Sequence, residues 1–295
     1  MDVDLGRPPY GTQDRKVMID GAQLAYLEAG SGSAIVLLHG NGGSSRDWNG
    51  VIPALATRNR VLAPDMPGYG ESDRAGEPTP QEFARRVWSF LKAVDAGTAV
   101  VVGHSMGGLV AMNIALAHPD QVSKLVLVDS AGLGRSIGLR QIALAATPLG
   151  DVVLAASMLP GGALFQTLDT GLSSTSQPWR VPPSWWKSQL RAGRGRRALK
   201  TTHATAKLCL GPLGQKCLVD ERLGELGMPT LVMWGLLDRV IPFWHGLRAS
   251  RRVPQGRLHL FPWCGHAPHV EASEEFLQAI EGFLSDSDDA VKTGR

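Results

Sequence analysis

Six short apolar runs recur along the chain, and segments with helical spacing follow them. The runs are rich in Val, Ile and Leu: AIVLLHG (34–40), RVLAPD (60–65), TAVVVG (98–103), KLVLVD (124–129), PTLVMWG (229–235) and RLHLF (257–261). Their unbroken apolar character is typical of strands that are buried on both faces. Strands of this kind alternating with helices predict an α/β fold with a mostly parallel central sheet flanked by helices.

Three further segments complete the predicted core. Residues 17–30 alternate around an Asp-Gly pair, which indicates an antiparallel hairpin at the edge of the sheet. Residues 79–96 begin with helix-start signals and place apolar side chains on one face, so they predict an amphipathic helix. A second amphipathic helix is expected after Ser273, and the polar residues 287–295 are expected to form a flexible C-terminal tail.

The alternation of strands and helices stops once, between residues 133 and 222. No strand-like run occurs there, so this segment is expected to be an inserted helical cap, with residues 1–132 and 223–286 forming the core. The low-charge stretch 141–165 is interrupted at Pro148 and again soon after. It therefore predicts two short apolar helices and no stable membrane insertion, since a span needs about 20 uninterrupted apolar residues.

The apolar side chains in the first half of the cap are more numerous than one short helix needs. They are Ile142, Leu144, Leu149, Val152, Val153, Leu154, Met158, Leu159 and Phe165. Two interpretations remain open: they form the buried underside of the cap, or they line a pocket for an apolar acyl or aromatic group.

The predicted cap is basic. Residues 133–222 hold 12 Lys or Arg and 4 Asp or Glu, a net charge of +8 in a chain whose total is +3. Much of this charge lies in PSWWKSQLRAGRGRRALK (183–200), where a solvated basic face is the simplest explanation. An anionic substrate or an anionic membrane surface is the alternative. No nucleic-acid recognition motif accompanies the charge, so no nucleic-acid partner is expected.

The N-terminus and the cysteines bear on location and on cofactors. The first ten residues, MDVDLGRPPY, are polar and acidic where a secretory signal has a basic start and an apolar stretch, so a cytoplasmic location is expected. Cys209, Cys217 and Cys264 show no metal-ligand spacing, and we expect free buried thiols. No metal or cofactor is expected, and the sequence assigns no oligomeric state.

The pattern G-x-S-x-G, which can mark a nucleophilic serine, occurs twice, around Ser105 and around Ser136. A nucleophilic serine needs a tight turn between a strand end and a helix start, because that turn exposes its hydroxyl. Ser105 follows TAVVVG and precedes a helical pattern, whereas Ser136 lies beyond the end of its strand. Ser105 is therefore the predicted nucleophile, and Ser136 is expected to be a loop or cap residue.

A serine nucleophile needs a base, and the base needs an acid that fixes its tautomer. In doubly wound sheets, the converging groups lie at the carboxyl ends of strands. Asp238 and His266 follow the last two predicted strands, which gives the chain order Ser, Asp, His. Asp129 also ends a strand and is the rival acid, while His269 is the rival base.

Five pieces of sequence, each at a strand end, resemble the α/β-hydrolase fold family in matching order. They are VLLHGNGG, APDMPGYGESD, VVGHSMGG, MWGLLD and CGHAPHVE, and they cover nearly the whole chain outside residues 133–222. The resemblance implies the serine branch of this fold with a helical lid. It also favours His266, which stands in the family pattern with Gly265, Pro268 and Glu271, and it favours Asp238 over Asp129.

Attack on a carbonyl creates an oxyanion, which needs preorganised donors. The resemblance implies that one donor is the backbone N–H of Met106 and that the other comes from the loop after the first parallel strand. We assign the second donor to Asn41, with Gly42 as the next choice. His39, in the same loop, is expected to brace it rather than to act as a second base.

Carboxylic ester hydrolysis through an acyl-enzyme is the activity that this resemblance implies first, acting on a small molecule with an apolar acyl or aromatic part. Haloalkane dehalogenases and epoxide hydrolases use aspartate in place of Ser105 and are excluded. Carbon-carbon hydrolases of ring-cleavage products remain an alternative, although they usually have asparagine before the serine and an aromatic after the histidine. This chain has His104 and Ala267 there. A small-molecule receptor on the same fold is the alternative of another class.

Overall fold

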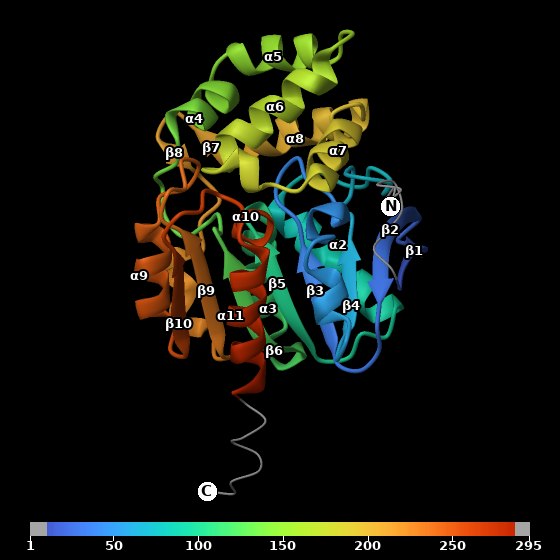
Figure 1. Cartoon of the computed structure of the whole chain (residues 1–295), viewed down its shortest axis with the longest axis vertical. Coiled ribbons are helices and arrows are strands. Elements are labelled where there is room, and N and C mark those ends of the chain that lie inside the picture. The colour runs from blue at the N-terminus through green and yellow to red at the C-terminus, as the bar shows by residue number, and fades with distance from the viewer. Residues whose placement is uncertain (1–10, 287–295) are drawn as a thin grey trace, which may run out of the picture.

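A sheet of eight strands forms the centre of the structure, a computed structural model that describes residues 11–286. Helices cover both faces of the sheet, and further helices lie above the carboxyl ends of its strands (Figure 1). The predicted tail at residues 287–295 lies outside the described residues, and so do the first ten residues, on which the expected absence of an export signal rests.

The strands confirm the predicted sheet. They are β1 (Thr12–Ile19), β2 (Ala22–Ala29), β3 (Ala34–Leu38), β4 (Arg60–Pro64), β5 (Ala99–His104), β6 (Val122–Val128), β9 (Thr230–Gly235) and β10 (Gly256–Phe261). Their order across the sheet is β1-β2-β4-β3-β5-β6-β9-β10. β1 and β2 pair antiparallel, as do β2 and β4, and every other pairing is parallel. β5 therefore lies near the middle, with its carboxyl end at the same edge as those of β6, β9 and β10.

The predicted edge hairpin is β1–β2, which turns at Asp20 and Gly21. Both residues have positive φ angles, 47° and 78°, and a two-residue hairpin of type I′ requires this. Glycine adopts this backbone at no steric cost, and aspartate is among the few other residues that tolerate it.

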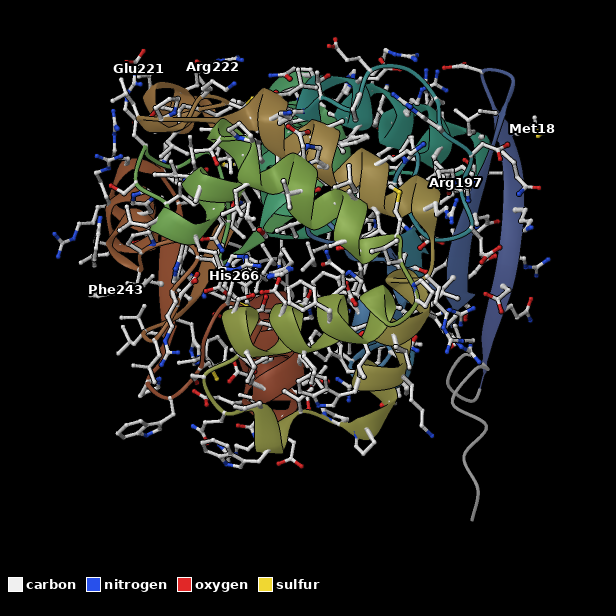
Figure 2. All side chains as sticks on the ribbon, turned by 90° about the horizontal axis from the view of Figure 1, so that it is seen from above. Met18, Arg197, Glu221, Arg222, Phe243 and His266 are labelled. Atoms are coloured by element: carbon white, nitrogen blue, oxygen red, sulfur yellow. The ribbon has the colours of Figure 1, made fainter. Side chains whose placement is uncertain are left out.

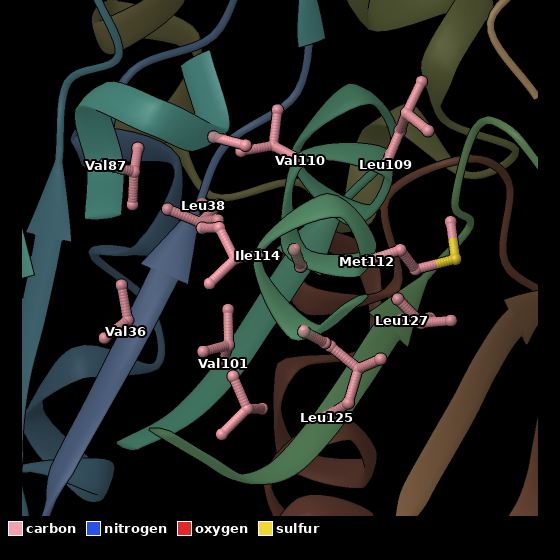
Figure 3. Close-up of a cluster of buried hydrophobic side chains, with 14 of the residues drawn as sticks. Val36, Leu38, Val87, Val101, Leu109, Val110, Met112, Ile114, Leu125 and Leu127 are labelled. Carbon is pink, nitrogen blue, oxygen red and sulfur yellow. The ribbon is translucent and has the colours of Figure 1, made fainter. Parts of the chain in front are cut away.

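The sheet is buried on both faces, as the unbroken apolar runs predict. Along β3, Val36 and Leu38 join one apolar cluster, whereas Ile35 and Leu37 join the other, and all four are fully buried. Figure 3 shows the first cluster, in which these β3 side chains meet others from α2 and α3.

Helices supply the other half of each cluster. The first cluster packs against α2 (Pro80–Ala93), α3 (Met106–Ala117) and α9 (Trp244–Arg252), and the second against α1 (Ile52–Leu55) and α11 (Ser273–Ser285). Shorter elements link them: η1 (Ser45–Trp48), η2 (Pro119–Gln121), η4 (Asp220–Glu225) and α10 (Pro268–Glu271).

The helix predicted at residues 79–96 is α2. It starts as expected, because the Thr79 side chain accepts a hydrogen bond from the Glu82 amide at 3.2 Å and Pro80 occupies the first turn. It ends earlier than predicted, at Ala93, and Asp95 then takes a positive φ of 50°.

A layer of helices lies above the carboxyl ends of the strands (Figure 1). They are α4 (Leu139–Ala146), α5 (Leu149–Ser157), α6 (Gly162–Ser174), α7 (Pro183–Ala192) and α8 (Arg196–Cys209), with η3 (Pro178–Arg180) between α6 and α7. All lie within the segment 133–222, which we continue to treat as the proposed cap. α4 and α5 confirm the two short apolar helices, although residues 162–165 already belong to α6.

The expectation that the cap contains no strand is wrong. β7 (Leu210–Gly211) and β8 (Gly214–Gln215) form a small antiparallel hairpin. Strands of two residues are too short to carry an apolar or alternating pattern, so sequence periodicity does not reveal them.

Among the described residues, no single helix has the length and apolar composition to cross a membrane. Only α4 and α5 taken together do, and they are bent by 86° relative to each other.

The expectation of buried cysteines is correct for Cys264 and wrong for the other two. Cys209 and Cys217 are only half-buried, because they flank the β7–β8 hairpin at the base of the cap.

Candidate active site

Ser105 occupies the turn between β5 and α3. Its φ of 53° and ψ of −117° form a backbone conformation that residues with a side chain seldom adopt. Two hydrogen bonds hold the turn: the Ser105 amide donates to Val128 O at 2.9 Å, and the Ala131 amide donates to Ser105 O at 3.0 Å. The strand-turn-helix setting predicted for Ser105 is therefore present.

The glycines on either side of Ser105 are sterically required. A Cβ on Gly103 would lie 2.3 Å from Gly107 O, and a Cβ on Gly107 would lie 2.2 Å from Leu38 O. Both distances are far below van der Waals contact. The two glycines therefore let α3 start directly against the ends of β5 and β3.

The structure brings the three predicted catalytic residues together. Ser105 Oγ lies 2.9 Å from His266 Nε2, and His266 Nδ1 lies 2.7 Å from Asp238 Oδ2. The other Asp238 oxygen accepts from the amides of Val240 and Ile241 at 2.7 and 3.0 Å. Asp238 thus accepts the Nδ1 proton of His266, which leaves Nε2 free to accept the proton of Ser105.

The rival acid is close but makes no hydrogen bond to the imidazole. Asp129 Oδ1 accepts from the Gly235 amide at 2.9 Å, and the residue is fully buried. Burial, reinforced by the neighbouring Asp238 carboxylate, raises the pKa of Asp129 well above its usual range.

The rival base and the rival serine lie in other surroundings. The buried His269 ring packs against Trp48 with centroids 4.4 Å apart, and burial lowers the pKa of His269 to about 3. Ser136 lies on an exposed loop, as expected.

The backbone of His266 is held from two sides. Its amide donates to Ser174 O, at the end of cap helix α6, at 2.7 Å. The His104 ring lies 2.6 Å from His266 O through Nε2, and burial lowers the pKa of His104 well below its usual value. A neutral His104 with its proton on Nε2 therefore donates to that carbonyl. Sequence reasoning identified neither contact, because both join segments far apart in the chain.

Glu271 ties the loop of His266 to the cap. Its Oε1 accepts from the Gly265 amide at 2.7 Å, and its Oε2 accepts from the amides of Ser176 and Gln177 at 2.8 and 2.9 Å. The family pattern singles out Glu271, but nothing in the sequence indicates its partners in the cap.

The loop after β3 is braced as expected. His39 donates through Nδ1 to Gly40 O at 2.8 Å and accepts from the Met66 amide at Nε2 at 3.0 Å. Within residues 11–286, the amides of Asn41 and Met106 have no protein acceptor. Both amides are thus available to an oxyanion, and we retain them as the proposed donors.

A cavity of about 340 Å³ lies between Ser105 and the cap. Three of the apolar cap residues that the sequence singles out line it: Leu144, Val153 and Leu154. Four others are exposed on the outer surface, namely Leu149, Val152, Leu159 and Phe165. The first group thus borders a cavity, which is consistent with the pocket interpretation, and the buried-underside interpretation is wrong for the second group.

The basic residues of the cap do not line this cavity, apart from one that is already paired. Arg140 of α4 lines it and forms an ion pair with Asp169 of α6. Arg194 is not among the lining residues, and Arg197 instead donates to Gly70 O at 3.2 Å. In the view from above, Arg197 lies toward β1 and β2, away from His266 (Figure 2). An anionic substrate held by these two arginines inside the cavity is therefore not supported.

A partly buried polar contact joins the cavity wall to the cap. Gln189 of α7 donates to Asp47 Oδ1 at 2.7 Å, and the Ser44 amide donates to Asp47 Oδ2 at 3.1 Å. Burial raises the pKa of Asp47 to about 7. The Asp47 carboxyl group therefore loses its proton and becomes negatively charged as the pH rises through about 7.

Comparison with known proteins shows which family the chain resembles. The profile of the α/β-hydrolase fold family matches residues 33–273. A 2-hydroxy-6-oxo-6-phenylhexa-2,4-dienoate hydrolase of Burkholderia cepacia is 31% identical over 268 residues, which cover 88% of this chain and 90% of that protein.

Solved structures show the same fold. A serine hydrolase involved in carbazole degradation has a TM-score of 0.74 and 28% identity, covering 93% of this chain and 99% of the other. A bacterial membrane phospholipase A has a TM-score of 0.79 and 24% identity, covering 94% and 86%.

The Glu271 contacts predict a coupled loss of stability and activity. In Glu271→Gln, an amide NH₂ replaces one acceptor oxygen and faces a backbone N–H, so we expect unfolding to become about 1–3 kcal/mol easier. We also expect kcat/KM to fall, because the loop of His266 loosens. Urea unfolding and ester kinetics measure the two effects. Glu274→Gln, an exposed site on α11, is the matched control, and equal behaviour of the two variants would refute the assignment.

The raised pKa of Asp47 predicts a specific pH dependence of stability. Between about pH 4 and pH 7, the folded state keeps a proton on Asp47 that the unfolded state loses, so stability falls as pH rises. The slope from this one group is at most about 1.4 kcal/mol per pH unit. Unfolding free energies at several pH values should show that Asp47→Asn removes this component while Asp120→Asn, an exposed control, keeps it. A wild-type curve parallel to that of Asp47→Asn contradicts the prediction.

Proposed function

The chain belongs to the α/β-hydrolase fold family, and we propose that it is a serine hydrolase that cleaves carboxylic esters or related acyl bonds. The observation that carries this proposal is the continuous hydrogen-bonded chain from Ser105 through His266 to Asp238, at a cavity large enough for a small substrate. A cavity of this size lies at the lower end of the range typical of small-molecule sites.

In the first step, Ser105 Oγ attacks the acyl carbonyl while His266 Nε2 takes its proton. Asp238 stabilises the imidazolium that forms and keeps the proton on Nδ1. The negative charge on the carbonyl oxygen is received by the amides of Met106 and Asn41. His266 then protonates the leaving alcohol, and an acyl-enzyme remains.

In the second step, His266 removes a proton from water, and the resulting attack releases the acid and regenerates Ser105. The cap takes part in both steps, because its Ser174 carbonyl accepts the His266 amide and its apolar side chains border the cavity. Substrate binding and the position of the base are thus linked.

The cavity favours a neutral substrate with an apolar acyl part. Leu144, Val153 and Leu154 supply apolar surface. Among the described residues that line the cavity, Arg140 is the one with a lysine or arginine side chain, and it forms an ion pair with Asp169. A substrate carboxylate in this cavity would have to break that ion pair, whereas a neutral acyl chain would not.

Carbon-carbon bond hydrolysis is the second candidate, favoured by the Burkholderia relative, whose name specifies a dienoate substrate. That anionic substrate needs a cationic partner, and the pairing of Arg140 with Asp169 argues against it here. The position before Ser105 also differs from these enzymes, because His104 occupies it and contacts His266 O.

The first test compares the two serines. Ser105→Ala should lower kcat/KM for p-nitrophenyl esters by about 10⁴-fold or more, because it removes the nucleophile. Ser136→Ala removes the serine of the second G-x-S-x-G match and leaves Ser105 intact. Its kcat/KM should equal that of the wild-type protein. Rapid hydrolysis by Ser105→Ala would contradict the proposal. Tight ester binding without turnover by the wild-type protein would indicate a receptor.

The second test separates the two bond types. We expect kcat/KM for neutral p-nitrophenyl esters to exceed that for a ring-cleavage dienoate, followed by loss of its visible absorbance, by at least about tenfold. Asp169→Asn frees Arg140 and should narrow this ratio by improving the dienoate. A wild-type preference for the dienoate would establish carbon-carbon hydrolysis instead.

A further inference from the structure

Two cysteines lie next to each other at the base of the cap. Cys209 is the last residue of α8, Cys217 follows β8, and their Sγ atoms are 3.3 Å apart in a thiol-thiol hydrogen bond. Neither takes part in the proposed hydrolysis.

The backbone around the pair is already held in place. β7 and β8 pair across the hairpin, and the Lys216 amide donates to Cys209 O at 2.8 Å. Gln215 fastens β8 to the core side, because its side chain accepts from the Gly132 amide and donates to Gly134 O. A disulfide has an S–S distance of about 2.05 Å, so the sulfurs need to approach by about 1.3 Å, which is within the reach of side-chain rotation.

The two thiols are chemically unequal. The hydrogen bond between the two thiols lowers the pKa of the Cys217 thiol to about 7, and the Lys216 ammonium acts in the same direction. The same hydrogen bond, together with burial, raises the pKa of Cys209 above its usual range. Cys217 is therefore the thiol that is substantially ionised near neutral pH, and the thiolate is the reactive form.

Small reagents have access to the pair. Cys209 and Cys217 are half-buried, and both line the cavity that contains Ser105. Cys264 is buried, and burial raises the pKa of its thiol to about 12. Cys264 is thus a built-in unreactive control.

We propose that Cys209 and Cys217 form a thiol modification site that reacts with low-molecular-weight disulfides and closes to an intramolecular disulfide.

The reaction runs in two exchange steps. The Cys217 thiolate attacks one sulfur of the small disulfide, forms a mixed disulfide and releases one small thiolate. Cys209 then attacks Cys217 Sγ, its proton passes to the second small thiolate, and the protein disulfide forms. Two protein thiols are oxidised, and one small disulfide is reduced to two thiols.

Closure changes the wall of the cavity. It joins the end of α8 to the strand that Gln215 anchors, and α8 also lines the cavity through Thr202 and Thr205. The redox state of the pair is therefore built into the substrate-facing surface.

The experiment incubates reduced protein with glutathione disulfide, quenches with acid, and reads intact mass and peptide maps. We expect wild type and Cys264→Ser to form the Cys209–Cys217 disulfide without retained glutathione. Cys209→Ser should accumulate one glutathione on Cys217, whereas Cys217→Ser should stay reduced over the same time. Between pH 6 and pH 8, the wild-type rate should rise about tenfold, following the thiolate fraction of Cys217.

The proposal is overturned if glutathione stays on the wild-type protein, if Cys217→Ser reacts as fast as Cys209→Ser, or if the disulfide involves Cys264 or a second chain. The wild-type peptide map decides the question even if a serine variant fails to fold. Ser105→Ala should form the disulfide like wild type, so this test does not depend on the proposed hydrolase activity.

Discussion

The backbone conformation of Ser105 is the constraint on which the rest of the site depends. A residue with a side chain at φ 53° is strained, and such strain persists only where the surroundings over-determine it. Here the amide and carbonyl of Ser105 are bonded to Val128 and Ala131, while Gly103 and Gly107 allow β5, α3 and β3 to meet at van der Waals distance. The central strands β3, β5 and β6 therefore fix the Ser105 hydroxyl at the carboxyl ends of the strands. His266 and Asp238 need only be brought to this fixed position.

The base reaches that hydroxyl from a loop of the core that is hydrogen-bonded to the cap. The Ser174 carbonyl accepts the His266 amide, and Glu271 bonds both the Gly265 amide and the start of the segment after α6. Moving the cap would therefore disturb the position of His266. A cap attached in this way acts on the proposed chemistry as well as on substrate selection, since it both borders the cavity and orients the base.

Local patterns explain how much of this the sequence predicts. The apolar runs, the Asp20-Gly21 turn and the setting of Ser105 are properties of adjacent residues, and the structure has all of them. The contacts that sequence misses join distant segments: Gln189 with Asp47, and Ser174 with His266. A hydrogen bond to a backbone carbonyl does not depend on the residue type, so the sequence gives no sign of it. A glutamine on a basic helix has no sequence feature that distinguishes it from a solvent-exposed side chain. The sequence also does not show that some apolar side chains of the cap face outward. Helical spacing shows which side chains share one face of a helix, but it does not show what that face packs against.

The two carboxyl groups behind His266 show why Asp238 rather than Asp129 is the proposed acid. Asp129, Asp238 and His266 each offer a ligand atom within 4.8 Å of the others, so two adjacent buried charges would repel strongly. Asp238 accepts two backbone amides and the imidazole, whereas Asp129 accepts one amide. Burial and the neighbouring Asp238 carboxylate raise the pKa of Asp129 well above its usual range, which favours the protonated form of Asp129. A protonated Asp129 adds no second negative charge beside His266, and Asp238 is the group that accepts the hydrogen bond from Nδ1 of His266 when His266 takes the proton of Ser105.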